Sequence, residues 1–157
     1  MKLRVRSAVM AILILLPTSF SALADEPQAP LTSRSVVQVK ARLEHAGPGK
    51  DVIVVCFDVQ KGWHIYANPA GAEELEAART TIEVVTKNAA KVHVDYPAGK
   101  EQNALGLKWK SYEGCFEIRA TVERDAKAGC PLEIDVRFQA VDDRSCLLAD
   151  TVRIPLK

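Results

Sequence analysis

The chain has 157 residues, of which 48% are hydrophobic, and its 21 basic residues nearly balance its 20 acidic residues. This composition is ordinary for one globular domain, so it argues against a disordered chain and against a large multidomain enzyme. A formal net charge of +1 also argues against nucleic-acid binding through a basic surface.

The N-terminus has the pattern of a secretory signal peptide. Three basic residues precede an uncharged apolar run over residues 8–16, which is too short to span a membrane. The sequence Ala22-Leu23-Ala24 supplies the small residues that a signal peptidase reads. We therefore expect a signal peptide at 1–24 with cleavage after Ala24, a flexible leader at 25–34 and one domain over 35–157. The expected location is the periplasm or the exterior, with no membrane span in the mature chain.

The rest of the chain is dominated by strand patterns. The segment 51–59 is apolar on both faces and therefore predicts a central buried strand. A turn is expected at Gly47-Pro48-Gly49, a short helical turn at 73–79, and an edge position for the last strand because of Pro155. Alternating or β-rich residues predict further strands at 37–43, 81–86, 91–96, 115–122, 132–138 and 147–156.

About seven short strands joined by turns predict an all-β protein, built as an antiparallel β-sandwich. The segments 115–122 and 132–138 alternate well, and residues 124–131 contain Gly129 and Pro131. We therefore expect these two strands to form a hairpin.

Two segments carry the candidate functional residues. Trp63, His64 and Tyr66 fall within four positions directly after the predicted central strand. These aromatic residues are equally explained as a cover over one end of the core. Cys146 follows a polar loop that contains Asp142 and Arg144. Such a thiol is either reactive toward disulfides or a structural cysteine.

Several other kinds of site lack support in the sequence. The three histidines lie on separate segments without the spacing of metal ligands, and no CxxC motif or nucleophile elbow occurs. Neither a hydrolase site, a metal nor a cofactor is therefore expected.

Four short motifs follow one another along the predicted domain. They are GWHIYANP at 62–69, DYPAG at 95–99, SYEG at 111–114 and QAVDDRSCL at 139–147. In their order and spacing they resemble the N-terminal periplasmic domain of the thiol:disulfide interchange protein DsbD, over residues 35–156. The resemblance implies an immunoglobulin-like sandwich and a part in protein-disulfide reduction. It also implies electron transfer between membrane redox proteins and periplasmic thioredoxin-like partners.

The family's working pair is two cysteines in the loop that corresponds to residues 140–146. Cys146 matches the second cysteine, whereas the first would stand at Val141 or Ala140. Neither residue has a thiol, so the family's disulfide cannot form here. Dithiol–disulfide exchange needs both an attacking and a resolving thiol.

Another cysteine could replace the missing thiol. The expected hairpin would bring Cys115 near Gln139 and would leave Cys130 about 30 Å away, at the other end of its strand. Cys115 is therefore the expected partner of Cys146. Cys56, in the predicted central strand, is expected to be a small inert hydrophobic residue.

The family also covers its cysteines with a cap loop, which corresponds here to residues 100–110 and includes Leu105. Such a cap would shield a reactive sulfur, although a hydrophobically anchored surface loop explains the same residues. Two functions stay open. One is a thiol–disulfide carrier that uses Cys146 and Cys115, and the other is a redox-silent protein-binding module. The predicted partner-binding or cap residues are Trp63, His64, Tyr66, Leu105, Asp142 and Arg144.

Overall fold

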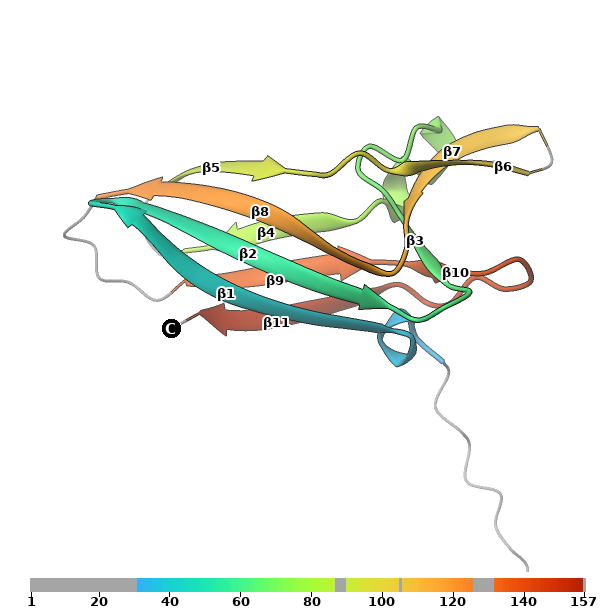
Figure 1. Cartoon of the computed structure of the whole chain (residues 1–157), viewed down its shortest axis with the longest axis horizontal. Coiled ribbons are helices and arrows are strands. Elements are labelled where there is room, and N and C mark those ends of the chain that lie inside the picture. The colour runs from blue at the N-terminus through green and yellow to red at the C-terminus, as the bar shows by residue number, and fades with distance from the viewer. Residues whose placement is uncertain (1–30, 87–89, 105, 126–131, 157) are drawn as a thin grey trace, which may run out of the picture.

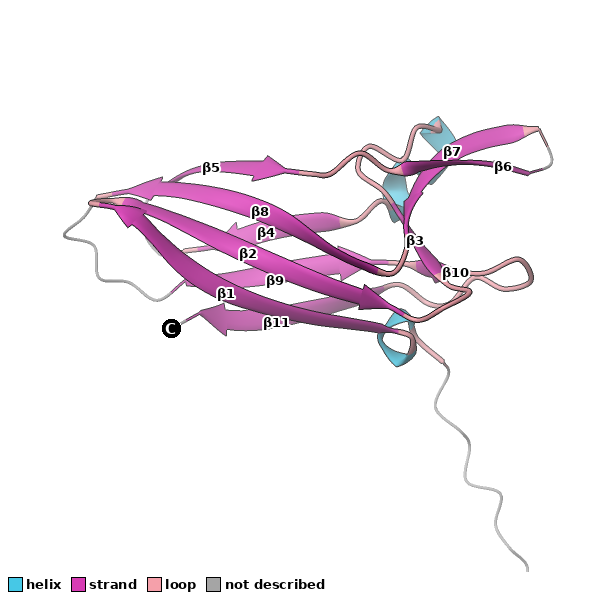
Figure 2. Ribbon diagram, in the orientation of Figure 1, coloured by secondary structure: helices cyan, strands magenta, loops and turns pink. Residues whose placement is uncertain are grey.

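The computed structural model describes residues 31–86, 90–104, 106–125 and 132–156, which form antiparallel sheets (Figure 1). The strands are β1 (Val37–Gly47), β2 (Lys50–Val59), β3 (His64–Tyr66), β4 (Thr81–Val85), β5 (Ala90–Asp95), β6 (Lys100–Ala104), β7 (Leu107–Tyr112), β8 (Cys115–Arg124), β9 (Leu132–Phe138), β10 (Ala140–Val141) and β11 (Asp150–Leu156). Short 3-10 helices lie at η1 (Ser33–Ser35) and η2 (Glu73–Ala78) (Figure 2). The predicted all-β class is confirmed, and the fold is an immunoglobulin-like sandwich.

Two sheets form the layers of the sandwich, and a third extends one end. The layers have the strand orders β1-β2-β8-β5 and β11-β9-β4, and the extension has the order β10-β3-β7-β6. The β6–β7 hairpin and the loop after β10 both project from this end (Figure 1).

The core lies between the two layers, because alternate residues of the facing strands are mostly apolar and point inward. Phe57 of β2 is central to this core. Its ring stacks on Phe116 with centroids 4.8 Å apart, and it meets Phe138 of the opposite layer edge-on at 6.2 Å. The fully buried side chains around it include Ile53, Val55, Ile118, Val122, Leu132, Ile134 and Val136.

Several predictions about individual elements are confirmed. β2 is central, because it pairs with β1 on one side and β8 on the other. The turn between β1 and β2 lies at Pro48 and Gly49, and η2 is the expected helical turn. β11 lies at the edge of its sheet, where Pro155 faces Glu133 of β9. An edge strand tolerates proline because one row of its N–H groups has no strand partner.

The predicted hairpin between residues 115–122 and 132–138 is wrong. β8 pairs with β2 and β5, whereas β9 pairs with β4 and β11 in the opposite layer. Both edges of β8 are therefore occupied, and its apolar inner face packs against that of β9 across the core. Residues 126–131, including Cys130, lie outside the described part of the chain.

A buried ion pair joins Asp51, near the start of β2, to Arg124, at the end of β8. These strand ends lie opposite the β6–β7 hairpin (Figure 1). Asp51 accepts hydrogen bonds from Arg124 Nη2 at 2.7 Å and Nε at 3.0 Å, and its other oxygen lies 2.6 Å from His45 Nδ1. Burial raises the pKa of Asp51, but the hydrogen bonds with His45 and Arg124 outweigh burial and hold this pKa below its ordinary value. The charged form of Asp51 therefore stabilises the folded state.

The expected signal peptide and most of the expected leader fall in residues 1–30, which lie outside the described residues. Within the described ranges, no helix is long and apolar enough to cross a membrane.

Candidate functional site

The loop between β10 and β11 returns alongside β10 and places Cys146 opposite Val141 in an isolated antiparallel bridge. Two backbone hydrogen bonds of 2.9 Å flank this pair, one from Asp142 N–H to Ser145 C=O and one from Leu147 N–H to Ala140 C=O. Facing residues enclosed in this way do not hydrogen-bond each other, and their Cα atoms lie about 4.5 Å apart. Val141, which is 5% exposed, therefore occupies the place from which a second thiol would reach Cys146.

Asp142 shapes the tip of this loop. Its Oδ1 accepts hydrogen bonds from the Arg144 N–H at 2.8 Å, the Ser145 N–H at 2.6 Å and the Ser145 hydroxyl at 2.8 Å. The Arg144 N–H and the Ser145 hydroxyl hold the pKa of Asp142 below its ordinary value. The side chain of Asp142 is thus engaged within the loop, whereas Arg144 is exposed to solvent.

Two side chains contact the sulfur of Cys146, which is an exposed free thiol. Gln139 Nε2 donates to Sγ at 3.1 Å and to the Leu147 carbonyl at 3.0 Å. The Tyr66 side chain also lies near this thiol, and burial, followed by the thiol, raises the pKa of Tyr66. The Cys146 thiol is thus exposed to solvent, and the hydrogen bond from Gln139 orients its side chain. Sequence analysis had not singled out Gln139 as a site residue, although it begins the last of the four motifs.

The third sheet places further residues of the site next to the Cys146 loop. Val141 faces His64 of β3, and Tyr66 faces Ser111 of β7. His64 is half-buried, and burial lowers its pKa despite the opposing charges of nearby acidic residues. Its imidazole is therefore neutral at neutral pH.

An open hollow of about 540 Å³ lies at the same end of the molecule. Trp63 and His64 line it, together with Lys100 of β6 and Asp143 of the Cys146 loop. Lys100 donates to Glu113 Oε1 at 2.6 Å across this hollow. The structure thus brings the first predicted segment, the Cys146 loop and the cap region to one end of the sandwich.

The cap region differs from the expected loop. Residues 100–104 and 107–112 are the strands β6 and β7, paired as a hairpin, and Leu105 lies outside the described residues. Gly99 lets the chain that enters this hairpin approach the third sheet closely. A Cβ atom at Gly99 would lie 2.6 Å from the Cβ of Ala67 and 2.8 Å from the Cβ of Lys110.

Cys115 has a different environment from Cys146. It begins β8, faces Asp58 of β2 and donates to Asp58 Oδ1 at 3.5 Å. The Asp58 carboxylate raises the pKa of the Cys115 thiol. The structure contains both Cys115 and Cys146 as free thiols, and the hairpin that led us to expect their pairing does not exist.

Cys56 also differs from expectation. It lies in the central strand as predicted, but it is half-buried and hydrogen-bonds with Arg42 and Glu117. Burial, followed by Glu117, raises the pKa of its thiol. Among the described residues, no group of three or more His, Cys, Asp or Glu side chains is placed to hold a metal ion.

Comparisons with known proteins reveal likeness in fold without likeness in sequence. No protein-family model and no curated protein matches the chain. The N-terminal periplasmic domain of ScsB from Proteus mirabilis aligns with a TM-score of 0.56 at 12% identity, over 76% of this chain and 44% of that chain. The GAE domain of GGA2p from Saccharomyces cerevisiae aligns at 0.50 and 8%, over 82% and 96%. The reduced DsbD N-terminal domain from Neisseria meningitidis aligns at 0.47 and 14%, over 80% and 87%.

These values support the sandwich fold alone. The chain spans less than half of the ScsB chain that it matches. Solved structures similar to it thus include N-terminal domains of the ScsB and DsbD type, at low identity.

Proposed function

We propose that this chain is an exported thiol–disulfide interchange domain that acts on periplasmic thioredoxin-like proteins through the single thiol of Cys146. The observation that carries this proposal is the exposed Cys146 thiol, to which Gln139 donates a hydrogen bond and near which Tyr66 lies, at the end of the sandwich that also carries Trp63 and the cap hairpin. The fold likeness to a periplasmic ScsB domain supports it. Residues 1–24 supply the export signal under this proposal.

The chemistry follows from what faces Cys146. Its thiolate attacks one sulfur of a partner's disulfide, a bond forms between the two sulfurs, and the partner's second sulfur leaves as a thiolate. Val141 cannot attack the new bond, so the mixed disulfide lasts until the partner's own thiolate, or a thiol from another molecule, displaces Cys146. The loop therefore forms and holds mixed disulfides rather than carrying two electrons by itself.

A redox-silent binding module is the second candidate, and the presence of Val141 opposite Cys146 favours it. In that case the end of the sandwich still docks a partner, through Trp63 and the cap hairpin, and no sulfur chemistry takes place. The two candidates differ in whether Cys146 is needed.

The test is a trapping experiment on the full mature protein. The probe is thioredoxin with one active-site cysteine, activated as a mixed disulfide with thionitrobenzoate. Attack by this chain releases thionitrobenzoate, which absorbance records, and peptide mass spectrometry locates the adduct. We expect the adduct at Cys146, with at least a tenfold loss of rate in Cys146→Ser. Cys115→Ser is the matched control, because Cys115 is also exposed, and it should retain the rate.

A second arm separates docking from reactivity. Trp63→Ala should slow the reaction with activated thioredoxin but not the reaction with free dithiobis-nitrobenzoate, because the small reagent needs no protein contact. Equal rates of thionitrobenzoate release in wild type and Cys146→Ser would overturn the proposal of a thiol–disulfide interchange domain. If Trp63→Ala then still weakened thioredoxin binding in a pull-down, the binding module would stand in its place.

A further inference from the structure

Cys56 and Cys115 lie side by side on the outer face of the sheet β1-β2-β8-β5. In the β2–β8 ladder, Cys56 faces Glu117 and Asp58 faces Cys115, so the two cysteines are diagonal neighbours. The backbone hydrogen bond from Val59 N–H to Gly114 C=O, 3.0 Å long, fixes the pattern at this end of the ladder. Both facing pairs are therefore of the kind that is not hydrogen-bonded, in which cross-strand side chains lie closest. Diagonal neighbours have Cα atoms about 7–8 Å apart and Cβ atoms somewhat closer.

The two cysteines also share one hollow of about 330 Å³. Phe57 and Phe116 contribute to its lining, together with Gln38 and Lys40 of β1. Cys115 is exposed and Cys56 is half-buried. A small reagent that reaches one thiol in this hollow is therefore within reach of the other.

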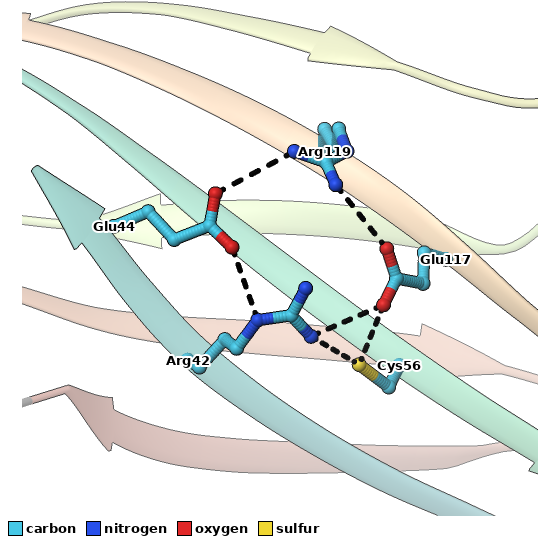
Figure 3. A network of polar contacts seen from close by, with 5 residues as sticks. All are labelled: Arg42, Glu44, Cys56, Glu117 and Arg119. Atoms are coloured by element: carbon cyan, nitrogen blue, oxygen red, sulfur yellow. Dashed lines mark hydrogen bonds and ion pairs between the residues drawn. The ribbon is translucent and has the colours of Figure 1, made fainter. Parts of the chain in front are cut away.

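Charged groups contact each of these thiols. Arg42, Glu44, Arg119 and Glu117 form a closed ring of alternating charges, and Cys56 joins it (Figure 3). Arg42 Nη1 donates to Cys56 Sγ at 3.0 Å, and Cys56 donates to Glu117 Oε1 at 3.4 Å. In the same way Cys115 donates to Asp58. Each thiol thus donates a hydrogen bond to a carboxylate. Burial and Glu117 raise the pKa of Cys56 despite the hydrogen bond from Arg42, and Asp58 raises the pKa of Cys115.

We propose that Cys56 and Cys115 are a second thiol pair of this protein, which closes to a disulfide across the β2–β8 ladder when a disulfide oxidant is present. With oxidised glutathione, the exposed Cys115 attacks one sulfur, forms a mixed disulfide and releases one glutathione thiolate. Cys56 then attacks the Cys115 sulfur and releases the second glutathione. Both cysteine protons are lost, and two electrons pass from the protein to the oxidant.

Closure requires a small movement of the backbone. Cα atoms joined by a disulfide are usually 4.4–6.8 Å apart and most often about 5.5–6 Å, so the diagonal pair must approach by roughly 2 Å. Cys115 is the first residue of β8 and directly follows Gly114, whose φ of 65° marks a turn, so the movement has to shift only this end of the β2–β8 ladder, together with the Val59–Gly114 hydrogen bond. The pair would give the chain the two-electron couple that Val141 denies to the Cys146 loop.

The test isolates this pair in the full mature chain. The double variant Cys130→Ser and Cys146→Ser keeps only Cys56 and Cys115. The folded protein is equilibrated with reduced and oxidised glutathione at several ratios, trapped by rapid alkylation and digested. We expect one linked peptide that joins Cys56 to Cys115, and both alkylation signals should fall together as the ratio becomes oxidising. A further Cys56→Ser change is the matched control, and it should accumulate a single glutathione adduct on Cys115.

Wild-type protein is mapped in parallel, so the proposal does not depend on the folding of any variant. Two free thiols at the most oxidising ratio, two separate glutathione adducts, or a bond from Cys115 to Cys146 would each overturn it. The outcome is independent of the proposed activity. The thioredoxin trapping experiment measures reaction at Cys146, whereas this experiment measures a bond between Cys56 and Cys115.

Discussion

The bridge between Val141 and Cys146 predicts that one substitution restores a disulfide in the loop. Val141→Cys places a thiol opposite Cys146 in a pair whose Cα atoms lie about 4.5 Å apart, within the range that a disulfide accepts. The bond would close a loop of about six residues, for which the chain-entropy relation gives about 2 kcal/mol of stabilisation of the oxidised protein. For a domain of this size, that corresponds to a rise in Tm of roughly 8 °C over the reduced protein.

The reduced variant should be slightly less stable than wild type. Val141 is 5% exposed, and loss of its packed methyl groups costs about 1 kcal/mol. The assay is thermal unfolding of oxidised and reduced protein, with a peptide map of the disulfide. Val141→Ala is the matched control, since it loses the same packing and should gain nothing on oxidation.

Two results would refute this reasoning. If the introduced thiol and Cys146 both stay free in oxidised glutathione, the bridge does not describe the loop. If the bond forms without a rise in Tm, the loop is too mobile in the folded protein for the entropy argument to hold. Under the proposed function, the oxidised variant should accept both electrons from a reduced thioredoxin, whereas wild type, whose Cys146 is a free thiol, should leave reduced thioredoxin unoxidised and form a mixed disulfide only with oxidised thioredoxin.

Three further substitutions test the fold that positions this loop. Phe57→Ala should lower the free energy of unfolding by about 3–5 kcal/mol in urea, against less than about 0.5 for the exposed control Val92→Ala. Asp51→Asn should cost about 3–5 kcal/mol at neutral pH, because it removes the buried charge that accepts two hydrogen bonds from Arg124. The lowered pKa of Asp51 stabilises the folded state above about pH 4, and this contribution is lost as pH falls through the folded pKa. The gap between wild type and variant should therefore close in acid, and a constant gap would contradict the ion-pair explanation. Gly99→Ala should lower the free energy of unfolding by about 1–3 kcal/mol through overpacking against Ala67 and Lys110. An unchanged Tm would show that Gly99 lies farther from these two residues.

The sequence predicted the strands of the two layers, because alternation directly records which face of a strand is buried. It did not predict the strands of the third sheet, β3, β6, β7 and β10. The segment 51–59 is apolar on both faces and is indeed the central strand β2, and Pro155 does mark an edge. The same reasoning failed for the partners of residues 115–124. Alternation reveals the buried face of a strand but not the strand beside it, and a short connection fits an arch between sheets as well as a hairpin.

The thiols show the same limit. The motif order pointed to Cys146, and its loop does lie beside the segment that carries Tyr66 and Trp63. The pairing that we expected for Cys115 depended on a neighbour that β8 does not have, so the place of Cys115 beside Cys56 emerged only from the ladder register.

The sequence by itself determined the all-β class, the inward faces of the strands and the absence of a second cysteine in the Cys146 loop. These are local properties, set by residue type and by a period of two along one strand. Only the tertiary structure decided that Val141 faces Cys146, that Gln139 donates to its sulfur and that Cys56 and Cys115 share one hollow. Such contacts depend on sheet order and register, which the packing of the whole chain around its core selects.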